Sequence, residues 1–249
     1  MKVHVVTNAN RTLYRRQLEQ MHRQRHQLFV EEMGWSDLAS PDGLEIDQFD
    51  NGDAVYLLAL DDGEVAGSMR LLPTWRRCMV TEVFPQFASE PVPVGPELWE
   101  WTRYCPGLMS KPRQLIRTRG ALLTATLEFA ASRGFRSYMA FGESKFMGQL
   151  VELGWSPAPL GMPRSFAPGS PTAMVMYWQI KPIDLANARR MFRLSAPVLV
   201  EAPAYTADVR TLIDIADVEA LVPVDTHAAR RQAPPAQPAL SELQVQGRA

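Results

Sequence analysis

Arginines stand at interior positions of two predicted elements, which limits what this chain can fold into. A helix is predicted from about residue 11 to about residue 33, because apolar positions recur there at steps of three and four. Arg25 lies on its apolar stripe, and Arg70 falls in a predicted strand where an aliphatic side chain is expected. A guanidinium that faces the interior needs an anion or carbonyl groups as partners. Alternatively, the stem of Arg25 packs while its head reaches solvent.

The first half of the chain has the pattern of an antiparallel sheet. Strands are predicted over residues 3–7, 54–60, 64–72 and 98–104, and Asp61-Asp62-Gly63 is the hairpin signal between the second and the third. Four prolines exclude a long element between residues 73 and 96. Strict alternation in the last strand places Glu100 and Arg103 on opposite faces, so only a bulge or a cleft at the strand end brings both to one site.

The second half alternates strands and helices. Helices are predicted over residues 113–132, ending at Gly134, and over residues 144–153, with strands at 137–141 and 172–180. Asp184 is a candidate cap for a further helix that reaches Leu194. An antiparallel first half followed by this alternation predicts an α/β (α+β) fold with a mixed sheet and helices covering its faces.

Composition excludes several classes of protein. The chain has 249 residues, of which 46% are hydrophobic and 21% charged, so we expect a folded core. A net charge of -1 gives no reason to expect a nucleic-acid partner. Because no stretch approaches the ~18 apolar residues of a membrane span and the first residues lack the run of a signal peptide, we expect a cytoplasmic protein.

Cysteines and histidines give little sign of a metal. Cys78 and Cys105 stand alone, so we expect two reduced structural thiols, and His22 with His26 lacks a third ligand. No metal site is therefore predicted. The segment between residues 103 and 127 carries five basic and no acidic residues, which makes it either an anion site or a solvated basic helix start.

A set of eight charged and aromatic residues carries a family resemblance. The chain reads Arg-x3-Phe-x5-Trp, then Glu-x-Asp-x-x-Asp, then a lone strand arginine, then Glu-x-x-Arg. This order resembles the acyl-homoserine-lactone synthases, the LuxI-type autoinducer synthases of quorum-sensing bacteria, over roughly residues 3–180. The residues that match are Arg25, Phe29, Trp35, Asp47, Asp50, Arg70, Glu100 and Arg103.

The resemblance implies a fold, two substrates and a product. The implied fold is that of the GCN5-related N-acetyltransferases, with an acyl-thioester cleft where two strands splay apart. The implied substrates are S-adenosylmethionine and an acyl thioester of acyl carrier protein or coenzyme A. The products are an N-acyl homoserine lactone, methylthioadenosine and the free thiol carrier, and no prosthetic group is implied.

These residues suit that chemistry. Arg25 or Arg70 can pair with the substrate carboxylate, and Asp47 or Asp50 with its ammonium. Phe29 and Trp35 offer aromatic faces to the adenine or sulfonium. The catalytic residues we expect are Glu100, Asp47 and Arg70, with Glu100 as the first candidate base. The substrate-binding residues we expect are Arg25, Phe29, Trp35, Asp50 and Arg103.

The thioester side of the site is less defined by sequence. The sequence Arg117-Thr-Arg119-Gly120 matches the start of the phosphate-binding turn of N-acetyltransferases. This chain then departs from the pattern of that turn at Leu122. We expect Arg117 or Arg119, with helix-start amides, to meet a phosphopantetheine phosphate or an acidic carrier surface. The alternatives are an N-acyltransferase that acts on another amine without lactonisation, and a non-catalytic S-adenosylmethionine sensor.

Three segments are predicted. Residues 1–181 form the acyltransferase domain, and residues 182–222 form a partly helical extension. Proline and glutamine enrichment in residues 223–249 predicts a disordered tail.

Overall fold

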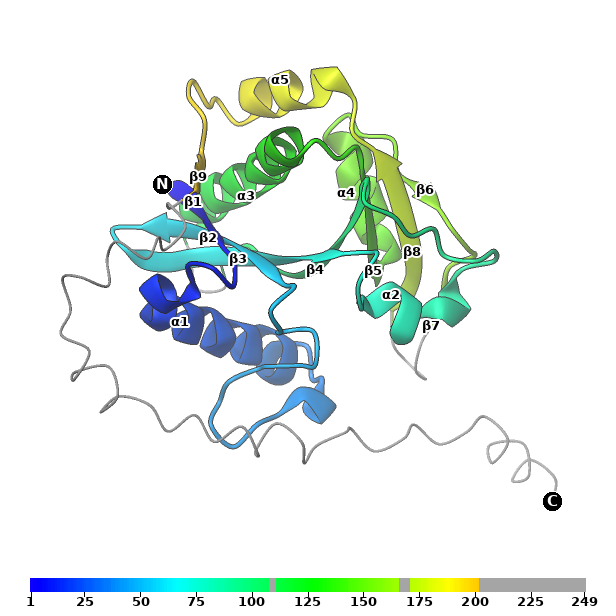
Figure 1. Ribbon diagram of the computed structural model, residues 1–249, viewed down its shortest axis with the longest axis horizontal. Coiled ribbons are helices and arrows are strands. Elements are labelled where there is room, and N and C mark those ends of the chain that lie inside the picture. Colours follow the sequence, from blue (N-terminus) through cyan, green and yellow to red (C-terminus); the bar gives the residue numbers. More distant parts are fainter. Residues whose placement is uncertain (108–110, 166–170, 202–249) are drawn as a thin grey trace. The chain divides into compact units, whose positions relative to one another are not determined.

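A mixed sheet forms the centre of the part of the chain that the computed structural model describes, residues 1–107, 111–165 and 171–201. Its nine strands lie in the order β6-β8-β5-β4-β3-β2-β1-β9, with β7 also paired to β8 (Figure 1). Parallel pairing joins β4 to β5 and β1 to β9, and the other pairs are antiparallel. The predicted fold class is confirmed. The strands are β1 Lys2–Val6, β2 Val55–Asp61, β3 Glu64–Pro73, β4 Leu98–Cys105, β5 Ser137–Glu143, β6 Ala158–Pro159, β7 Arg164–Ser165, β8 Thr172–Gln179 and β9 Leu199–Glu201.

Helices cover both faces of the sheet. In Figure 1, α1 (Arg15–Arg25) lies on one face and α3 (Pro112–Arg133) lies on the other, with α5 (Pro182–Met191) beyond α3. Gly134, with φ 74°, ends α3 where the sequence predicts the stop. The short α2 (Met79–Glu82) and α4 (Ser144–Glu152) lie beside β4, β5 and β8.

The first predicted helix has three parts. A 3-10 turn over Arg11–Tyr14 leads into α1, and a π-helical segment over His26–Glu32 follows. The Met33 N–H donates to the carbonyl of Leu28, five residues back, at 2.9 Å. Periodicity alone does not distinguish this wider turn from an α-helix. Segments of this kind are frequent at functional sites.

The predicted hairpin is confirmed. Asp62 and Gly63 form the two-residue turn between β2 and β3, with φ values of 51° and 82°. Positive φ at both turn residues is the I′ geometry, which matches the twist of paired strands. The hairpin thereby places β3, which carries Arg70, at the middle of the sheet.

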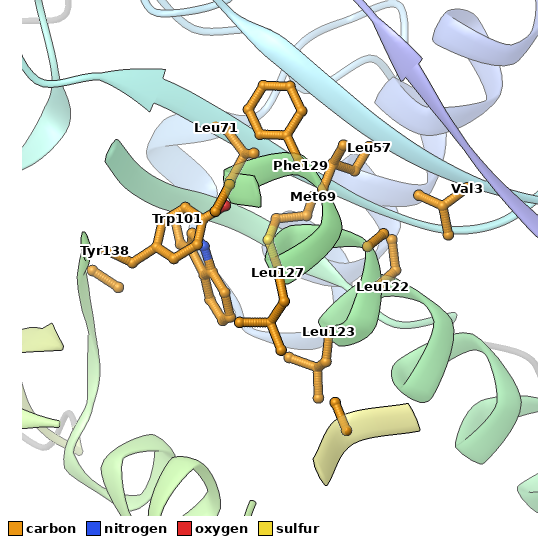
Figure 2. Packing of buried hydrophobic residues seen from close by; sticks show 14 of the residues in the cluster. Val3, Leu57, Met69, Leu71, Trp101, Leu122, Leu123, Leu127, Phe129 and Tyr138 are labelled. Carbon is orange, nitrogen blue, oxygen red and sulfur yellow. The ribbon is translucent and has the colours of Figure 1, made fainter. Parts of the chain in front are cut away.

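Two apolar clusters lie on the two faces of the sheet. On the α3 side, side chains of β1, β2, β3 and β4 pack against the helix; Figure 2 shows Leu71 and Trp101 of the strands together with Phe129 of the helix. On the α1 side, the second cluster includes Leu18, Met21 and Val80. Burial of this much apolar surface is the main stabilising term of the fold.

The proline-rich stretch after β3 contains an element that the sequence analysis missed. Prolines do exclude a long helix there, but α2 fits between them, followed by a 3-10 turn over Pro85–Phe87. Close by, the parallel pairing of β4 and β5 stops at Trp101 and Ala140, although both strands continue. The two strands therefore part beside α2.

The chain after β8 returns to the sheet. Glu128 of α3 accepts hydrogen bonds from the Val198 and Leu199 N–H groups at 3.0 and 2.8 Å, which holds β9 beside β1. Arg189 of α5 pairs with the same carboxylate at 2.7 Å. The predicted domain boundary at residue 181 stays a prediction, and the predicted tail lies outside the described residues.

The extension predicted to be partly helical, residues 182–222, is described as far as residue 201, and that part contains α5. Asp184 lies in its first turn, where its Oδ2 accepts from the Lys181 N–H at 2.8 Å. Within the described ranges, no helix has the length and apolar character that crossing a membrane requires.

Gly120→Ala is expected to destabilise the fold. A Cβ at Gly120 would lie 2.6 Å from the Phe192 ring, which packs on α3 just after α5. We expect the free energy of unfolding in urea to fall by about 1–3 kcal/mol. Gly148→Ala is the matched control, since nothing lies within 4 Å of its Cβ position, and it should be neutral or stabilising. Equal effects of the two substitutions would contradict this packing.

Candidate functional site

Six charged side chains close into a ring of ion pairs between α1 and the sheet. Neighbouring members lie 2.5–2.8 Å apart from nitrogen to oxygen. Arginine and carboxylate alternate around the ring, so three positive and three negative charges cancel. A buried charge is tolerated only when it is paired in this way. In order of contact, the ring runs Arg25, Asp50, Arg70, Asp47, Arg103, Glu45 and back to Arg25.

Four segments supply the ring. Arg25 is the last residue of α1, Arg70 lies in β3 and Arg103 in β4. The three carboxylates come from one irregular loop before β2, where Asp47 also accepts a hydrogen bond from the Phe49 N–H at 2.8 Å. Ion pairing thus fixes a loop that has no regular structure of its own.

A bulge in β4 turns Arg103 toward the ring. In the register of β3 with β4, Arg70 lies opposite Thr102 and Ser68 lies opposite Cys105. One residue of β3 between these pairs therefore faces two residues of β4, Arg103 and the residue after it. Arg103 has a φ of 51°, which is strained for a residue with a Cβ. Sequence reasoning required a bulge or a cleft at the strand end for Glu100 and Arg103 to reach one site, and the bulge is present.

Neighbouring charges set the pKa values in the ring. Burial alone would raise the pKa of Glu45, but Arg25 and Arg103 lower it to about 2. Burial also opposes ionisation of Asp50, but the positive charges of Arg25 and Arg70 hold the pKa of Asp50 well below its usual range. These ring carboxylates are thus charged at neutral pH.

Exposure differs between the two sides of the ring. The side chains of Asp47 and Arg103 are 9% and 6% exposed, while the other four are at most 1% exposed. Arg25 has all of its donor nitrogens engaged by Glu45 and Asp50. The accessible edge of the ring is therefore the one formed by Asp47 and Arg103.

Two aromatic rings border this edge. Phe29 and Trp35 stack with centroids 5.2 Å apart, and the Trp35 N–H donates to the Phe29 carbonyl at 2.8 Å. The Arg103 guanidinium lies 5.4 Å from the centroid of Phe29. A cation or an adenine ring can bind against such a pair.

Glu100 lies behind the ring and holds the start of α2. It is wholly buried and accepts hydrogen bonds from the N–H groups of Met79 and Val80 at 2.7 and 3.0 Å. Burial raises its pKa to about 7, against those two donors and Arg70, which lower it. Both protonation states of Glu100 are therefore accessible near neutral pH.

Arg117 and Arg119 lie away from the ring, inside α3. Because the helix begins at Pro112, the backbone N–H groups at these positions are engaged in the helix and are not free at its start. The expectation that helix-start amides and Arg117 or Arg119 meet a phosphate stays a prediction. Gly120 contacts Phe192.

Several partners of the site were missed from the sequence. Glu45 bridges Arg25 and Arg103, and its place in the Glu-x-Asp-x-x-Asp stretch was the available signal. The Tyr56 hydroxyl donates to Asp50 at 2.9 Å, and Arg70 Nε donates to the Thr102 hydroxyl at 2.9 Å. No local pattern marks these last two.

Other features of the described residues do not join this site. A surface pocket lies where β4 and β5 begin, lined in part by Leu98, Ser137 and Tyr177, and none of the predicted site residues lines it. Both cysteines are free and buried. Across the ranges the structure covers, no cluster of three or more histidine, cysteine or acidic side chains is placed to hold a metal.

Comparisons with known proteins agree on one family. Residues 9–181 match the family described as autoinducer synthase. The chain is 39% identical over 162 residues to an isovaleryl-homoserine lactone synthase of Bradyrhizobium diazoefficiens, covering 65% of this chain and 73% of that protein. It is 28% identical over 207 residues to an acyl-homoserine-lactone synthase of Rhizobium etli, covering 80% and 92%.

Solved structures show the same likeness. A CoA-dependent acyl-homoserine lactone synthase, BjaI, with SAM and isopentyl-CoA, superposes with a TM-score of 0.75 at 32% identity, covering 84% of this chain and 97% of that one. A second CoA-dependent acyl-homoserine lactone synthase, MesI, superposes with a TM-score of 0.70 at 34% identity, covering 80% and 99%.

Glu45→Gln is expected to destabilise the protein strongly. Arg25 and Arg103 would lose a shared charge, so the free energy of unfolding in urea at pH 7 should fall by about 3 kcal/mol. Since the pKa of Glu45 is lowered from 4.5 to about 2, its contribution is complete above about pH 4.5 and is lost as pH falls toward 2. The difference between wild type and variant should shrink over that range.

Glu19→Gln is the control for this substitution. Glu19 forms an exposed pair with Arg23 on α1, and its loss should change stability by under ~0.5 kcal/mol. A Glu45→Gln effect as small as this, or one that grows in acid, would show that the ring does not stabilise the fold.

Proposed function

The chain belongs to the autoinducer synthase family, and on that premise we propose that it makes an N-acyl-L-homoserine lactone from S-adenosylmethionine and an acyl thioester, with release of methylthioadenosine. It is an acyltransferase, and S-adenosylmethionine is a substrate. The observation that carries the proposal is the ring of alternating charge, open at Asp47 and Arg103 beside a stacked aromatic pair. Such an edge suits a substrate with a carboxylate, an ammonium and a sulfonium.

We divide the roles among the predicted residues according to their exposure and contacts. We assign Asp47 to the substrate ammonium and Phe29 with Trp35 to the adenosyl sulfonium group, because all three border the accessible edge. Arg70 holds Asp47 through both terminal nitrogens, at 2.6 and 2.9 Å, and positions it. Substrate binding by Arg25 and Asp50 stays a prediction, and their burial favours a structural role.

Acyl transfer requires a neutral amine. The substrate's α-amino group has a pKa near ~8, so a base must remove its proton, and we assign this to Glu100 directly or through water. A pKa of about 7 suits that task. The amine then attacks the thioester carbonyl, and the tetrahedral intermediate collapses with expulsion of the thiol.

Ring closure completes the reaction. The substrate carboxylate attacks the carbon bonded to the sulfonium, the carbon–sulfur bond breaks, and methylthioadenosine leaves with the electron pair. Both reacting groups belong to one molecule, so this step depends on holding the chain folded back on itself. The charged edge binds the amino-acid end of S-adenosylmethionine, and the aromatic pair binds its adenosyl end.

We propose coenzyme A as the carrier of the acyl group. The support is that BjaI and MesI, 32% and 34% identical, are described as CoA-dependent. The thioester would lie where β4 and β5 part after Trp101 and Ala140. Arg117, which is exposed, and Arg119 are then candidates for side-chain contact with the coenzyme A phosphates.

One incubation tests the function against its alternatives. Purified protein is given S-adenosylmethionine with isovaleryl-CoA, other acyl-CoAs or acyl carrier protein thioesters. Methylthioadenosine release that requires the thioester supports lactone synthesis. Free thiol without methylthioadenosine would indicate transfer to another amine. Neither product, with S-adenosylmethionine bound, would indicate a sensor.

Glu100→Gln is expected to lower turnover far more than substrate affinity. Loss of a general base reduces kcat by about 10²–10⁴-fold, while the Kd for S-adenosylmethionine should stay within about threefold. In the wild type, kcat/KM should rise with pH through about 7 as Glu100 of the free enzyme loses its proton, and the variant should lack this rise. Glu97→Gln, an exposed neighbour in sequence, is the control. Equal losses of affinity and turnover would remove Glu100 from the role of base.

A further inference from the structure

A strap formed by residues 182–201 covers α3 on the side away from the sheet. The strap follows residue 181, where the match to the family ends, and it consists of α5, the turn after it and β9. Figure 1 shows α5 beyond α3, and the chain then returns to β9 at the edge of the sheet beside β1. The reaction proposed above gives this strap no task.

The burial of α3 shows that the cover is complete over much of the helix. Every residue from Thr118 to Ala130 except Arg119 is buried, so this part of α3 is enclosed on all sides. A helix that packs on a sheet alone keeps one side in solvent. The residues of α3 before Thr118 include the exposed Arg117. Arg117 and Arg119, the candidate phosphate contacts, therefore lie where the enclosed part of the helix begins.

One turn of α3 is held from both sides at this point. A Cβ on Gly120 would lie 2.6 Å from the ring of Phe192, which belongs to the strap. On the sheet side, a Cβ on Gly67 of β3 would lie 2.6 Å from the side chain of Thr118. The absence of these two side chains lets the strap, the helix and the sheet pack this closely. The position of the turn is thus set by Phe192 on one side and by β3 on the other.

Phe192 is itself fixed in place. It ends α5, and the next residue, Arg193, has a φ of 54°, a left-handed conformation that glycine usually supplies at this position. The Leu194 N–H donates to the Arg189 carbonyl at 2.8 Å, which closes the turn. The Arg189 side chain pairs with Glu128, a buried carboxylate of α3, at 2.7 Å. The turn that presents Phe192 is therefore tied to the same helix by an ion pair.

We propose that the strap, through Phe192, positions the turn of α3 that carries Arg117 and Arg119 for the phosphate groups of the acyl donor. The proposal rests on the function and the coenzyme A contact proposed above. Phe192 acts through α3, so it is a positioning residue. The phosphates of coenzyme A are remote from the reacting carbonyl, and such remote binding contributes equally to the ground state and the transition state. Loss of Phe192 should therefore raise KM without lowering kcat.

Phe192→Ala tests this role. The KM for the acyl thioester should rise about five- to tenfold, while kcat and the Kd for S-adenosylmethionine stay within about twofold of the wild type. Phe192→Leu keeps much of the apolar bulk and should bring KM back to within about threefold. Ile183→Ala is the control, because it shortens a side chain of α5 that is 56% exposed, and it should change none of these constants.

Hydrogen exchange of the α3 amides gives a reading that needs no activity. In Phe192→Ala, the amides of residues 117–120 should exchange about tenfold or more faster than in the wild type, and in Ile183→Ala they should not. Urea denaturation checks that the variants are folded. If Phe192→Ala is unfolded, Phe192→Val takes its place with the same expected pattern.

The outcomes separate the strap from the function. Unchanged exchange in Phe192→Ala, or faster exchange with an unchanged KM, would overturn the positioning role alone. A parallel loss of kcat and of S-adenosylmethionine affinity would also overturn it, because that pattern indicates a general disturbance of the fold.

Wild-type protein that releases no methylthioadenosine with any thioester would overturn the proposed function. Calorimetric titration with coenzyme A then decides the proposal about the strap. A Kd for coenzyme A that is about fivefold or more weaker in Phe192→Ala than in the wild type would support it. An equal Kd in the two proteins, or no binding to the wild type, would overturn it.

Discussion

Burial of three guanidinium groups is the constraint on which the rest of this structure depends. Each must meet a carboxylate, and the three carboxylates come from one loop without regular structure. Formation of the ring therefore docks α1 on the sheet, orders that loop and selects the bulged form of β4. Charge pairing organises this face of the protein, while apolar packing organises the face that α3 covers.

A closed ring also explains how a charged site can be rigid before a substrate arrives. Charges that are already paired and oriented need little rearrangement when a polar substrate binds. The inner members, among them Arg25 and Asp50, keep the frame in place, and the edge at Asp47 and Arg103 remains open to a ligand. Glu100 joins this frame to α2 and so to Met79.

Local patterns predicted much of the fold and part of the site. The hairpin at Asp62 and the stop at Gly134 follow from backbone geometry, and the apolar stripe indicated that Arg25 faces inward. Contacts across the fold had no such signal. Alternation placed Arg103 on the wrong face unless β4 bulged, the short α2 fell among prolines, and the pairing of β9 with β1 joins residues far apart in sequence.

The most direct measurement of this account is a pair of crystal structures, of the free protein and of its complex with S-adenosylmethionine. The account predicts that all six ring residues keep their partners in the complex, and that the substrate ammonium lies at Asp47 with the adenosyl sulfonium group against Phe29 and Trp35. A complex in which Arg25 or Asp50 leaves the ring to bind the substrate would contradict it.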